Sequence, residues 1–389
     1  MPEYPCRTAN PSTMANMPAA PEPVLKEAVE PAGAAAPAGE ICTSASTANS
    51  GASDAHTACA SSGAAPRLGT VDVIDALGAD CSQAAIPVAL LRQGGYARAV
   101  LQDAVERLFA ASGVSFSPGE RVLVKPNLVS RANARLSCTH PEVVRAVCAH
   151  VLDCGATPRV ADSPAFGSAA RVAEACGLAA SVASLGLRVT NLGRPASLRL
   201  GLGGSIGLSR DALDADRIVS VARLKAHGQF RVTASVKNLF GCVCGCRKAL
   251  AHMRLGEQPG AMESMVLDVA AALPPTVAVA DGIVCLHKGG PVRGEAYNLG
   301  LLGASATPLA LDAVLFGLLG QTPGSVPLWA EALRRGLPGV RPGDAAFPLA
   351  APASFNATGF VIAAALDPMR FEPLRFVRGR VKSLLDGLG

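Results

Sequence analysis

The feature that most constrains the fold is an alternation, from about residue 68 onward, of short apolar runs with longer segments of helical period. The apolar runs occupy residues 121–124, 158–161, 187–190, 217–222, 276–280 and 299–304. The segments of helical period occupy residues 97–112, 139–155, 168–177 and 307–319. Strands that alternate with helices are typical of βαβ units. The sequence therefore predicts an α/β fold, in which a mostly parallel sheet carries helices on both faces.

Two helix starts can be predicted from capping patterns. Thr139 is followed three positions later by Glu142, which is a capping-box pattern, and the helix that begins there is expected to end at Gly155. Ser168 is expected to cap a second helix that ends near Gly177.

Composition divides the chain into three regions. Residues 1–66 are rich in Ala, Pro, Ser, Thr and Gly, with Tyr4 as their one aromatic residue, so they are expected to form a disordered low-complexity tail. Residues 67–325 are expected to form the α/β domain. Residues 326–389 are expected to form a helical extension, with a late strand at 359–364.

Charge and hydropathy exclude several function classes. The net charge is +5, from 35 basic and 30 acidic residues, and no basic block is interleaved with aromatic residues, so nucleic-acid binding is not expected. No run of about 18 apolar residues predicts a membrane span, and the first residues do not resemble an export signal. We therefore expect a cytoplasmic protein whose 12 cysteines are reduced thiols or metal ligands.

Polar residues cluster where the predicted strands end. These residues are Lys125 and Asn127, Asp162 and Ser163, Lys225 and His227, Asp281, and Ser305. Ligands of open α/β sheets bind outside the carboxyl ends of the strands. If all five strands are parallel, their turns share one edge, and the sequence predicts a polar ligand site there.

Each of these residues has a functional and a structural interpretation. Lys125 precedes a proline, which holds it in an extended backbone where it can bind an anion, or it is a solvated lysine at a strand end. Asp162 and Ser163 can bind a ligand or cap a turn. His227 lies two residues after Lys225, and a neighbouring ammonium favours the neutral imidazole that a general base needs, although a hydrogen-bonded loop histidine fits equally.

A second polar segment follows at residues 233–241. Lys237 and Asn238 add a cation and an amide, and Gly241 allows close approach of the backbone to a ligand. The structural alternative is a helix that ends with Gly241 as its C-cap.

Three cysteines at alternate positions come next, namely Cys242, Cys244 and Cys246, with Lys248 and His252 downstream. On an extended strand the thiols would lie about 7 Å apart, too far to share one zinc ion, unless the glycine between the last two folds a turn. A metal or iron–sulfur site, a redox-active thiol pair and incidental loop cysteines all remain open.

Together these motifs resemble the prokaryotic family called domain of unknown function 362. The matching segments are Val124-Lys-Pro-Asn127, Asp162-Ser-Pro164, Leu224-Lys-Ala-His227, Val236-Lys-Asn-Leu-Phe-Gly241, Lys248 with His252, Asp281-Gly282, and Ala304-Ser305 ahead of Leu311-Asp312-Ala313. Many members carry ferredoxin-like iron–sulfur modules, so the resemblance implies redox work for those members. This chain departs from them, since it contains no C-x2-C-x2-C-x3-C run, and Leu286-His-Lys-Gly-Gly290 replaces an acidic stretch.

The leading hypothesis is an enzyme that acts on a small anionic substrate, and oxidoreductase is the enzyme class that this hypothesis considers. His227, Asp162 and Lys225 are the catalytic candidates. The substrate-binding candidates are Lys125, Asn127, Ser163, Lys237, Asn238, Lys248, His252 and Asp281. The cofactor alternatives are an iron–sulfur cluster or a divalent metal at the cysteine triplet, and the partner alternative is a ferredoxin-like electron carrier. A non-catalytic carrier or maturation protein for a metabolite or metal is the second hypothesis, and an iron–sulfur or zinc protein is the third.

Overall fold

A computed structural model of the protein describes residues 85–164, 167–245 and 258–366. These residues belong to the second of two units into which the chain divides, Ala79–Gly389. The predicted tail at 1–66 lies outside the described residues.

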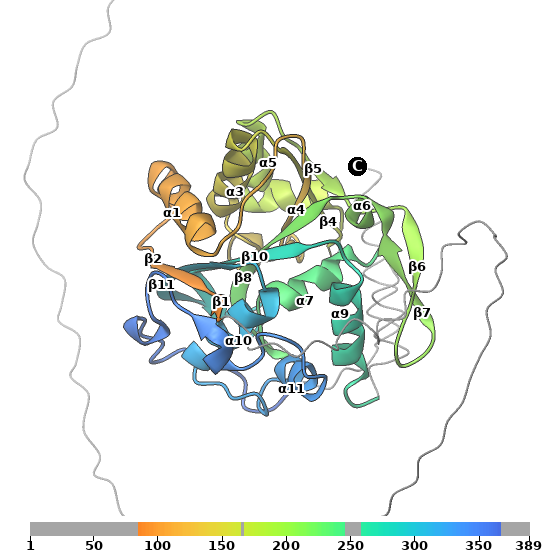
Figure 1. The fold of residues 1–389 in the computed structure, drawn as a ribbon, viewed down its shortest axis with the longest axis vertical. Coiled ribbons are helices and arrows are strands. Elements are labelled where there is room, and N and C mark those ends of the chain that lie inside the picture. Colours follow the sequence, from red (N-terminus) through yellow and green to blue (C-terminus); the bar gives the residue numbers. More distant parts are fainter. Residues whose placement is uncertain (1–84, 165–166, 246–257, 367–389) are drawn as a thin grey trace, which may run out of the picture. The chain divides into compact units, whose positions relative to one another are not determined.

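One large sheet forms the centre of the described unit (Figure 1). Its strands are β2 (Ala89–Arg92), β3 (Arg121–Pro126), β4 (Thr157–Asp162), β5 (Val189–Asn191), β8 (Arg217–His227), β9 (Arg231–Thr233), β10 (Thr276–His287) and β11 (Glu295–Ser305). Their spatial order is β2-β11-β10-β8-β3-β4-β5, and β9 pairs onto β8. The pairs from β10 to β5 are all parallel, whereas β11, β2 and β9 pair in the antiparallel sense. The prediction of a mostly parallel sheet is confirmed.

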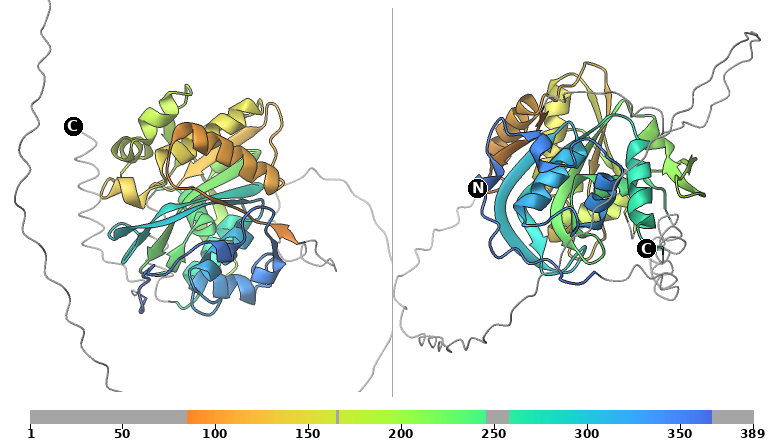
Figure 2. Two further views of the ribbon diagram at one scale, coloured as in Figure 1. Left: turned by 90° about the vertical axis from the view of Figure 1, so that its left-hand side faces the viewer. Right: turned by 60° about the horizontal axis from the view of Figure 1, so that its bottom comes forward.

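Helices cover both faces of this sheet, as predicted (Figure 2). One face carries α1 (Arg98–Ala111), α3 (Pro141–Asp153), α4 (Ala169–Cys176) and α5 (Leu178–Ala183), with the short α2 (Ala134–Ser137) nearby. The other face carries α7 (Ser235–Leu239), α9 (Ala261–Ala271), α10 (Pro308–Leu318) and α11 (Pro327–Arg334). Alternate residues of β8 enter the two hydrophobic clusters, with Ile218 in one and Val219 in the other, as the period of a strand requires.

The smaller elements lie around this core. They are β1 (Ile86–Pro87) paired with β12 (Ala345–Ala346), the hairpin of β6 (Pro195–Arg199) and β7 (Ser205–Ser209), α6 (Arg210–Leu213), and the 3-10 turns η1 (Phe240–Cys242), η2 (Pro342–Asp344) and η3 (Pro352–Ser354). Among the described helices, none is both long and apolar enough to cross a membrane.

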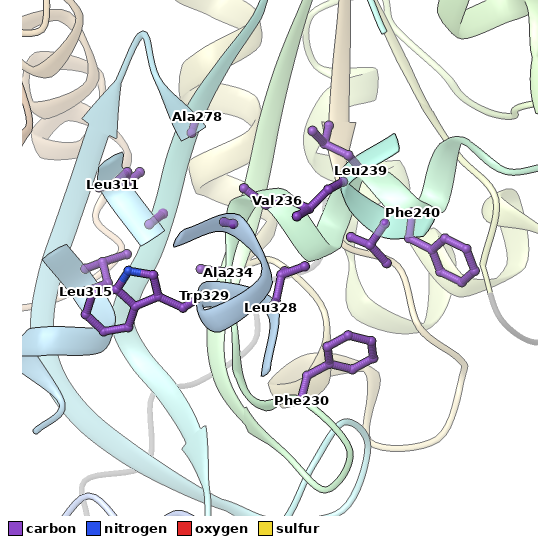
Figure 3. Packing of buried hydrophobic residues seen from close by; sticks show 14 of the residues in the cluster. Phe230, Ala234, Val236, Leu239, Phe240, Ala278, Leu311, Leu315, Leu328 and Trp329 are labelled. Atoms are coloured by element: carbon purple, nitrogen blue, oxygen red, sulfur yellow. The ribbon is translucent and has the colours of Figure 1, made fainter. Parts of the chain in front are cut away.

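The face of α7, α10 and α11 is packed by large apolar side chains (Figure 3). Leu311 and Leu315 of α10 lie in the same cluster as Trp329 of α11 and Val236 of α7. The indole nitrogen of Trp329 donates a hydrogen bond to the Val340 carbonyl at 2.6 Å, so this buried polar atom is satisfied. This packing holds α7 against the centre of the sheet, where the polar residues gather.

Two predictions made from the sequence, one helix cap and one strand, are wrong. The N-cap of α3 is His140, whose Nδ1 accepts from the Glu142 backbone, because the Thr139 hydroxyl is already engaged by the Val221 carbonyl and the Asn127 backbone nitrogen. Residues 359–364 form no strand, since Gly359 turns the chain with a φ of 87°. The predicted cap at Ser168 is confirmed by its hydrogen bond from the Arg171 backbone, and that helix ends at Gly177.

The carboxyl edge of the sheet differs from the prediction in the direction of β11 and in the lengths of β8 and β10. β11 follows β10 in a hairpin, because the connecting segment 288–294 is too short for a parallel crossover, so Ser305 pairs with Ala278 at the opposite edge of the sheet. Ser305 is therefore not at the carboxyl edge. Lys225, His227 and Asp281 lie inside β8 and β10, which are longer than predicted, and β8 continues past the last pairing of β3 with it, Pro126 with Val221.

Candidate functional site at the carboxyl edge

The site is built around a buried ion pair between neighbouring strands. Lys125, at the end of β3, has no exposed side-chain surface, and its Nζ lies 2.7 Å from Oδ1 of Asp162, at the end of β4. The same Nζ donates to Oδ1 of Asn238 at 3.0 Å and to the Pro126 carbonyl at 3.1 Å. Three acceptors, one of them ionic, match the three protons of an ammonium group. The geometry therefore gives Lys125 an organising role.

The Asp162 carboxylate ties the turns after β3 and β4 together. Its Oδ2 accepts from the Leu128 backbone at 2.8 Å, and its Oδ1 accepts from the Ser163 backbone at 2.8 Å as well as from Lys125. The Ser163 hydroxyl in turn accepts from the Gly245 backbone at 3.3 Å. A buried carboxylate needs such donors to offset the loss of hydration.

The helix α7 supplies the third side of this arrangement. The Asn238 amide nitrogen donates to the Lys125 carbonyl at 3.2 Å and to the Ser220 hydroxyl at 3.0 Å. Gly241 follows in η1, and a Cβ built on it would lie 2.3 Å from Lys125 Nζ and 2.4 Å from Asp162 Oδ1. Gly241 thus leaves the ion pair the space that a side chain would occupy. The close approach of a ligand at Gly241 stays a prediction.

Asn127 links this ion pair to a second buried lysine. Its Nδ2 donates to Asn238 Oδ1 at 3.2 Å, and its Oδ1 accepts from the Nζ of Lys225. Lys225 also donates to the Ser137 carbonyl at 2.9 Å. Since β3 ends at Pro126 while β8 continues, Asn127 can bridge the end of β3 to Lys225 on the extension of β8.

The environment of Lys225 disfavours its charged form. The side chain is 3% exposed. Burial is the main cause that lowers its pKa from 10.5 to about 7, and the charges of Lys237 and Arg223 lower it further, while Cys138 and Asp162 act in the opposite direction. At neutral pH a substantial fraction of Lys225 is therefore the free amine, which can accept a proton or attack an electrophile.

A buried thiol, Cys138, lies close to this lysine and is paired with a second buried thiol, Cys176. Cys138 hydrogen-bonds with the Cys176 thiol, which is the main cause that lowers the Cys138 pKa to about 6, and a bond from the Val129 backbone and the charge of Lys225 act in the same direction. The pKa of Cys176 is raised correspondingly by its bond to Cys138. Both sulfurs are free thiols in the structure.

A second buried ion pair fills a gap between β8 and β10. Arg223 Nε lies 3.2 Å from Asp281 Oδ2 and donates to the Cys138 carbonyl at 3.0 Å. The Tyr96 hydroxyl donates to Asp281 Oδ1 at 2.9 Å, and the tyrosine ring stacks on His140 with a centroid distance of 3.5 Å. The pairing of β8 with β10 shifts register just after Asp281, so the long arginine side chain occupies the space where these strands separate.

An aspartate from another helix fixes α7 in place. Asp312 of α10 is 2% exposed, and its two oxygens accept from the backbone nitrogens of Ser235 and Val236 at 2.8 and 2.9 Å. These amides are at the N-terminus of α7, where the helix cannot satisfy them. Burial raises the pKa of Asp312 to about 7, although both hydrogen bonds lower it.

Lys237 and His227 lie close to this network. The Lys237 ammonium lies over the rings of Phe230 and Phe240, at 5.0 and 5.1 Å from their centroids, and its side chain is half-buried. Nδ1 of His227 accepts from the backbone nitrogens of Gln229 at 3.1 Å and Phe230 at 3.4 Å, so the neutral ring carries its proton on Nε2. His227 is 7% exposed.

The structure describes two of the three cysteines of the triplet. Cys242 and Cys244 are buried, and the Cys244 thiol donates to the Gly193 carbonyl at 3.3 Å. Within the described ranges, no group of three His, Cys, Asp or Glu side chains could hold a metal ion. Cys246, Lys248 and His252 lie outside the described residues, so the metal and thiol hypotheses for the triplet stay predictions.

The structure thus joins five of the nine described catalytic and substrate-binding candidates into one network. Lys125, Asp162, Asn238, Asn127 and Lys225 are connected by consecutive hydrogen bonds. Asp281 belongs to the neighbouring Arg223 pair instead. Sequence reasoning did not assign roles to Arg223, Cys138, Tyr96 or Asp312. Arg223 and Asp312 could have been noticed, because each is a charged residue inside an otherwise apolar segment.

The sequence that forms this fold and its carboxyl edge matches a known family. The model of the domain of unknown function DUF362 matches residues 122–316. A Synechocystis sp. protein that is named as thylakoid-associated is 35% identical over 301 residues, which cover 76% of this chain and 93% of the relative. The chain therefore belongs to the DUF362 family, and the resemblance seen in its motifs is confirmed.

Similarity to solved structures is limited to parts of the fold. The lactate racemase apoprotein from Thermoanaerobacterium thermosaccharolyticum matches with 11% identity and a TM-score of 0.37, over 57% of this chain and 54% of that chain. A Thermotoga maritima protein solved by a structural genomics consortium matches with 11% identity and a TM-score of 0.33, over 53% of this chain and 56% of that chain.

Proposed function

We propose that the protein is an enzyme that binds a small anionic substrate at the carboxyl edge of its sheet. The observation that carries this proposal is a buried network at the carboxyl edge that joins Lys125 to Lys225 through Asn238 and Asn127. Within it the Lys225 amine donates only to neutral oxygens. An anion beside Lys225 would stabilise its ammonium form and take the place of lost hydration.

Lys225 is the best candidate for proton transfer in this enzyme. Its pKa of about 7 suits a group that must gain and lose a proton at neutral pH. Asp162 is less suited, because both of its oxygens already accept hydrogen bonds from Lys125 and two backbone nitrogens. His227 remains a second proton-transfer candidate of the proposal, two positions along the same strand.

Anion binding can be measured without knowing the natural substrate. Inorganic phosphate and oxalate, which represent phosphates and carboxylates, should raise the unfolding temperature in a saturable manner, because a ligand bound only by the folded state stabilises it. The effect should be lost in Lys237→Gln and kept in Lys288→Gln, whose lysine is 47% exposed. An equal response of both variants and the parent would overturn the proposed anion site.

A non-catalytic carrier is the second hypothesis, and it is favoured by the same buried lysines. Measurement of turnover distinguishes the two hypotheses. An enzyme should turn over a bound anion and lose that turnover in Lys225→Met, whereas a carrier would bind the anion without turnover. The redox part of the proposal involves a ferredoxin-like electron carrier as partner, and it is supported by the family resemblance.

The cysteine triplet offers a separate test of a metal function. Anaerobic purification followed by iron, zinc and sulfide analysis would support a cluster if the metal content fell in Cys244→Ala. A folded protein without these elements would remove the third hypothesis.

The cytoplasmic location is also part of the proposal. The relative from Synechocystis sp. is named as thylakoid-associated, so fractionation of the natural host is the direct test. Recovery of the chain with salt-washed membranes would contradict a cytoplasmic location.

A further inference from the structure

The two buried lysines of the site differ in what their amines can donate to. Lys125 has three acceptors, including the Asp162 carboxylate, as an ammonium requires. Lys225 donates to two neutral oxygens, Asn127 Oδ1 and the Ser137 carbonyl. A neutral amine has two N–H bonds and one lone pair. Two acceptors therefore satisfy the neutral form of Lys225 and leave its lone pair for another atom.

Burial of Lys225 favours the same form. The cations Lys237 and Arg223 also lower the pKa of Lys225, whereas Cys138 and Asp162 raise it, and the net shift is downward. The sulfur of Cys138 already receives hydrogen bonds from the Cys176 thiol and the Val129 backbone. A lysine amine that is desolvated beside other cations is the usual form of a lysine nucleophile.

The residue that pairs with Lys225 across the strands carries a buried hydroxyl that has no partner among the described residues. Thr233 of β9 pairs directly with Lys225 of β8, so the two side chains are neighbours on one face of the strand pair. Thr233 is 4% exposed, and its Oγ1 has no hydrogen-bond partner among the described residues. A buried hydroxyl in that state costs free energy unless a ligand satisfies it. Its position indicates a polar ligand atom next to Lys225.

We propose that Lys225 is a nucleophile that forms an imine with an anionic carbonyl compound of the 2-oxo acid class. The amine lone pair attacks the carbonyl carbon and forms the C–N bond. The carbonyl oxygen then leaves as water with the two amine hydrogens, so no oxidant or reductant is needed. The Thr233 hydroxyl donates to the departing oxygen or to the carboxylate, and Lys237 attracts the carboxylate. This inference rests on the proposed anion site and names its substrate class.

Reductive trapping tests the inference on the full-length protein. Glyoxylate, the smallest anionic aldehyde of this class, is added with cyanoborohydride at pH 7, and the lysines that become carboxymethylated are mapped by peptide mass spectrometry. Lys225 should be trapped at least about tenfold faster than the exposed Lys288, because an ordinary lysine is almost fully protonated at this pH. Trapping at Lys288 and other exposed lysines without Lys225 would overturn the inference.

A matched pair of variants separates a role for Thr233 from a general effect on folding. Thr233→Val should slow trapping at Lys225 about fivefold or more without loss of stability, because it removes a hydroxyl that has no partner. Thr190→Val is the control, since Thr190 Oγ1 is also buried without a described partner but lies in β5, at the far end of the sheet order. Equal trapping rates in both variants would exclude Thr233 from the site.

The pH dependence and the anion assay complete the test. Trapping at Lys225 should follow a pKa near 7 in the parent and a higher pKa in Lys237→Met, because a nearby cation is removed. Saturable phosphate or oxalate binding without trapping at Lys225 would remove the imine alone. If neither saturable anion binding nor trapping at Lys225 is observed, the proposed anion site is overturned as well.

Discussion

At the scale of single residues, Gly241 shows how tightly the buried ion pair is enclosed. A methyl group at this position would lie 2.3 Å from Lys125 Nζ and 2.4 Å from Asp162 Oδ1, far inside contact distance. Both of those groups are buried and charged, so neither can move into water without losing its partner.

Gly241→Ala should therefore lower the free energy of unfolding by about 2–4 kcal/mol. Urea denaturation followed by circular dichroism measures this difference. Gly317→Ala in α10 is the control, since nothing lies within 4 Å of a Cβ there, and alanine is the better helix residue. A loss of stability in Gly317→Ala equal to that in Gly241→Ala would contradict the explanation by steric conflict.

The two buried lysines should respond differently to replacement by methionine. Lys125→Met leaves the Asp162 carboxylate buried without its cation and should cost about 3–5 kcal/mol. Lys225→Met removes two hydrogen bonds to neutral acceptors and should cost no more than about 2 kcal/mol at pH 7. Similar losses in both variants would mean that Lys225 is held as an ammonium.

The pH dependence of stability should report the lowered pKa of Lys225 directly. Between pH 7 and 10.5 the unfolded chain binds a proton at this lysine that the folded chain does not, so stability rises with pH in this window. From pH 7 to 9 the parent should gain roughly 2–3 kcal/mol relative to Lys225→Met. A constant difference in urea unfolding at both pH values would show that the lysine titrates normally.

Much of the candidate site could be predicted at this scale. The sequence places lysine, asparagine and aspartate directly after buried strands, and the carboxyl ends of parallel strands adjoin. It could not predict that Lys125 and Asp162 would neutralise each other, because that depends on the side-by-side pairing of β3 with β4. Cys138 and Tyr96 could not be predicted either, since their roles arise from contacts across more than 80 residues of chain.

At the scale of elements, α7 is a five-residue helix that depends on its neighbours. A helix this short is not stable in isolation. Asp312 of α10 binds its first amides, and apolar side chains of α10 and α11 pack against it (Figure 3). The helix that carries Lys237 and Asn238 is thus positioned by residues about 75 positions further along the chain.

Asp312→Asn should destabilise the protein by about 1–3 kcal/mol at pH 5, because an amide group accepts on one side only and leaves one buried backbone amide without a partner. The folded pKa of Asp312 is raised from 3.8 to about 7, so its carboxyl binds a proton more tightly in the folded chain. The contribution of Asp312 to the free energy of unfolding therefore falls as pH rises from about 4 to 7. The deficit of Asp312→Asn should shrink between pH 5 and 7, as measured by urea unfolding.

Hydrogen exchange of the α7 amides tests the role of Asp312 directly. The Ser235 and Val236 amides should exchange with deuterium faster in Asp312→Asn than in the parent, since their hydrogen bonds protect them. Unchanged protection of both amides would show that α7 does not rely on this aspartate.

The strands were predicted at the correct places in the sequence, but two of them were predicted to end too early. Apolar runs located β3, β4, β8, β10 and β11 correctly, because a strand buried on both faces is continuously apolar. The runs ended too early in β8 and β10, where buried charged residues such as Arg223, Lys225 and Asp281 continue the strand. A charged residue indicates a strand end unless a partner from elsewhere in the fold neutralises it, and that partner cannot be seen locally.

At the scale of the molecule, the described unit has two hydrophobic clusters separated by one sheet. Among the residues that the structure describes, the buried apolar side chains lie between Val88 and Phe355. The α/β class followed from the alternation of strands and helices. The direction of β11 did not, because the short connection after β10, not the apolar pattern, decides between a hairpin and a crossover.

This arrangement leads to a prediction about the N-terminal region, which we propose to be a tail. Deletion of residues 1–66 should leave the free energy of unfolding within about 0.5 kcal/mol of the full chain, because a segment so poor in large apolar residues has little surface to bury. Deletion of residues 1–92 is the matched contrast. It also removes β1 and β2, including the buried Val88 and Leu90, and leaves β11 as an open edge. Urea denaturation of the three chains decides the question, since a large loss in the shorter deletion would show that residues 1–66 pack against the sheet domain.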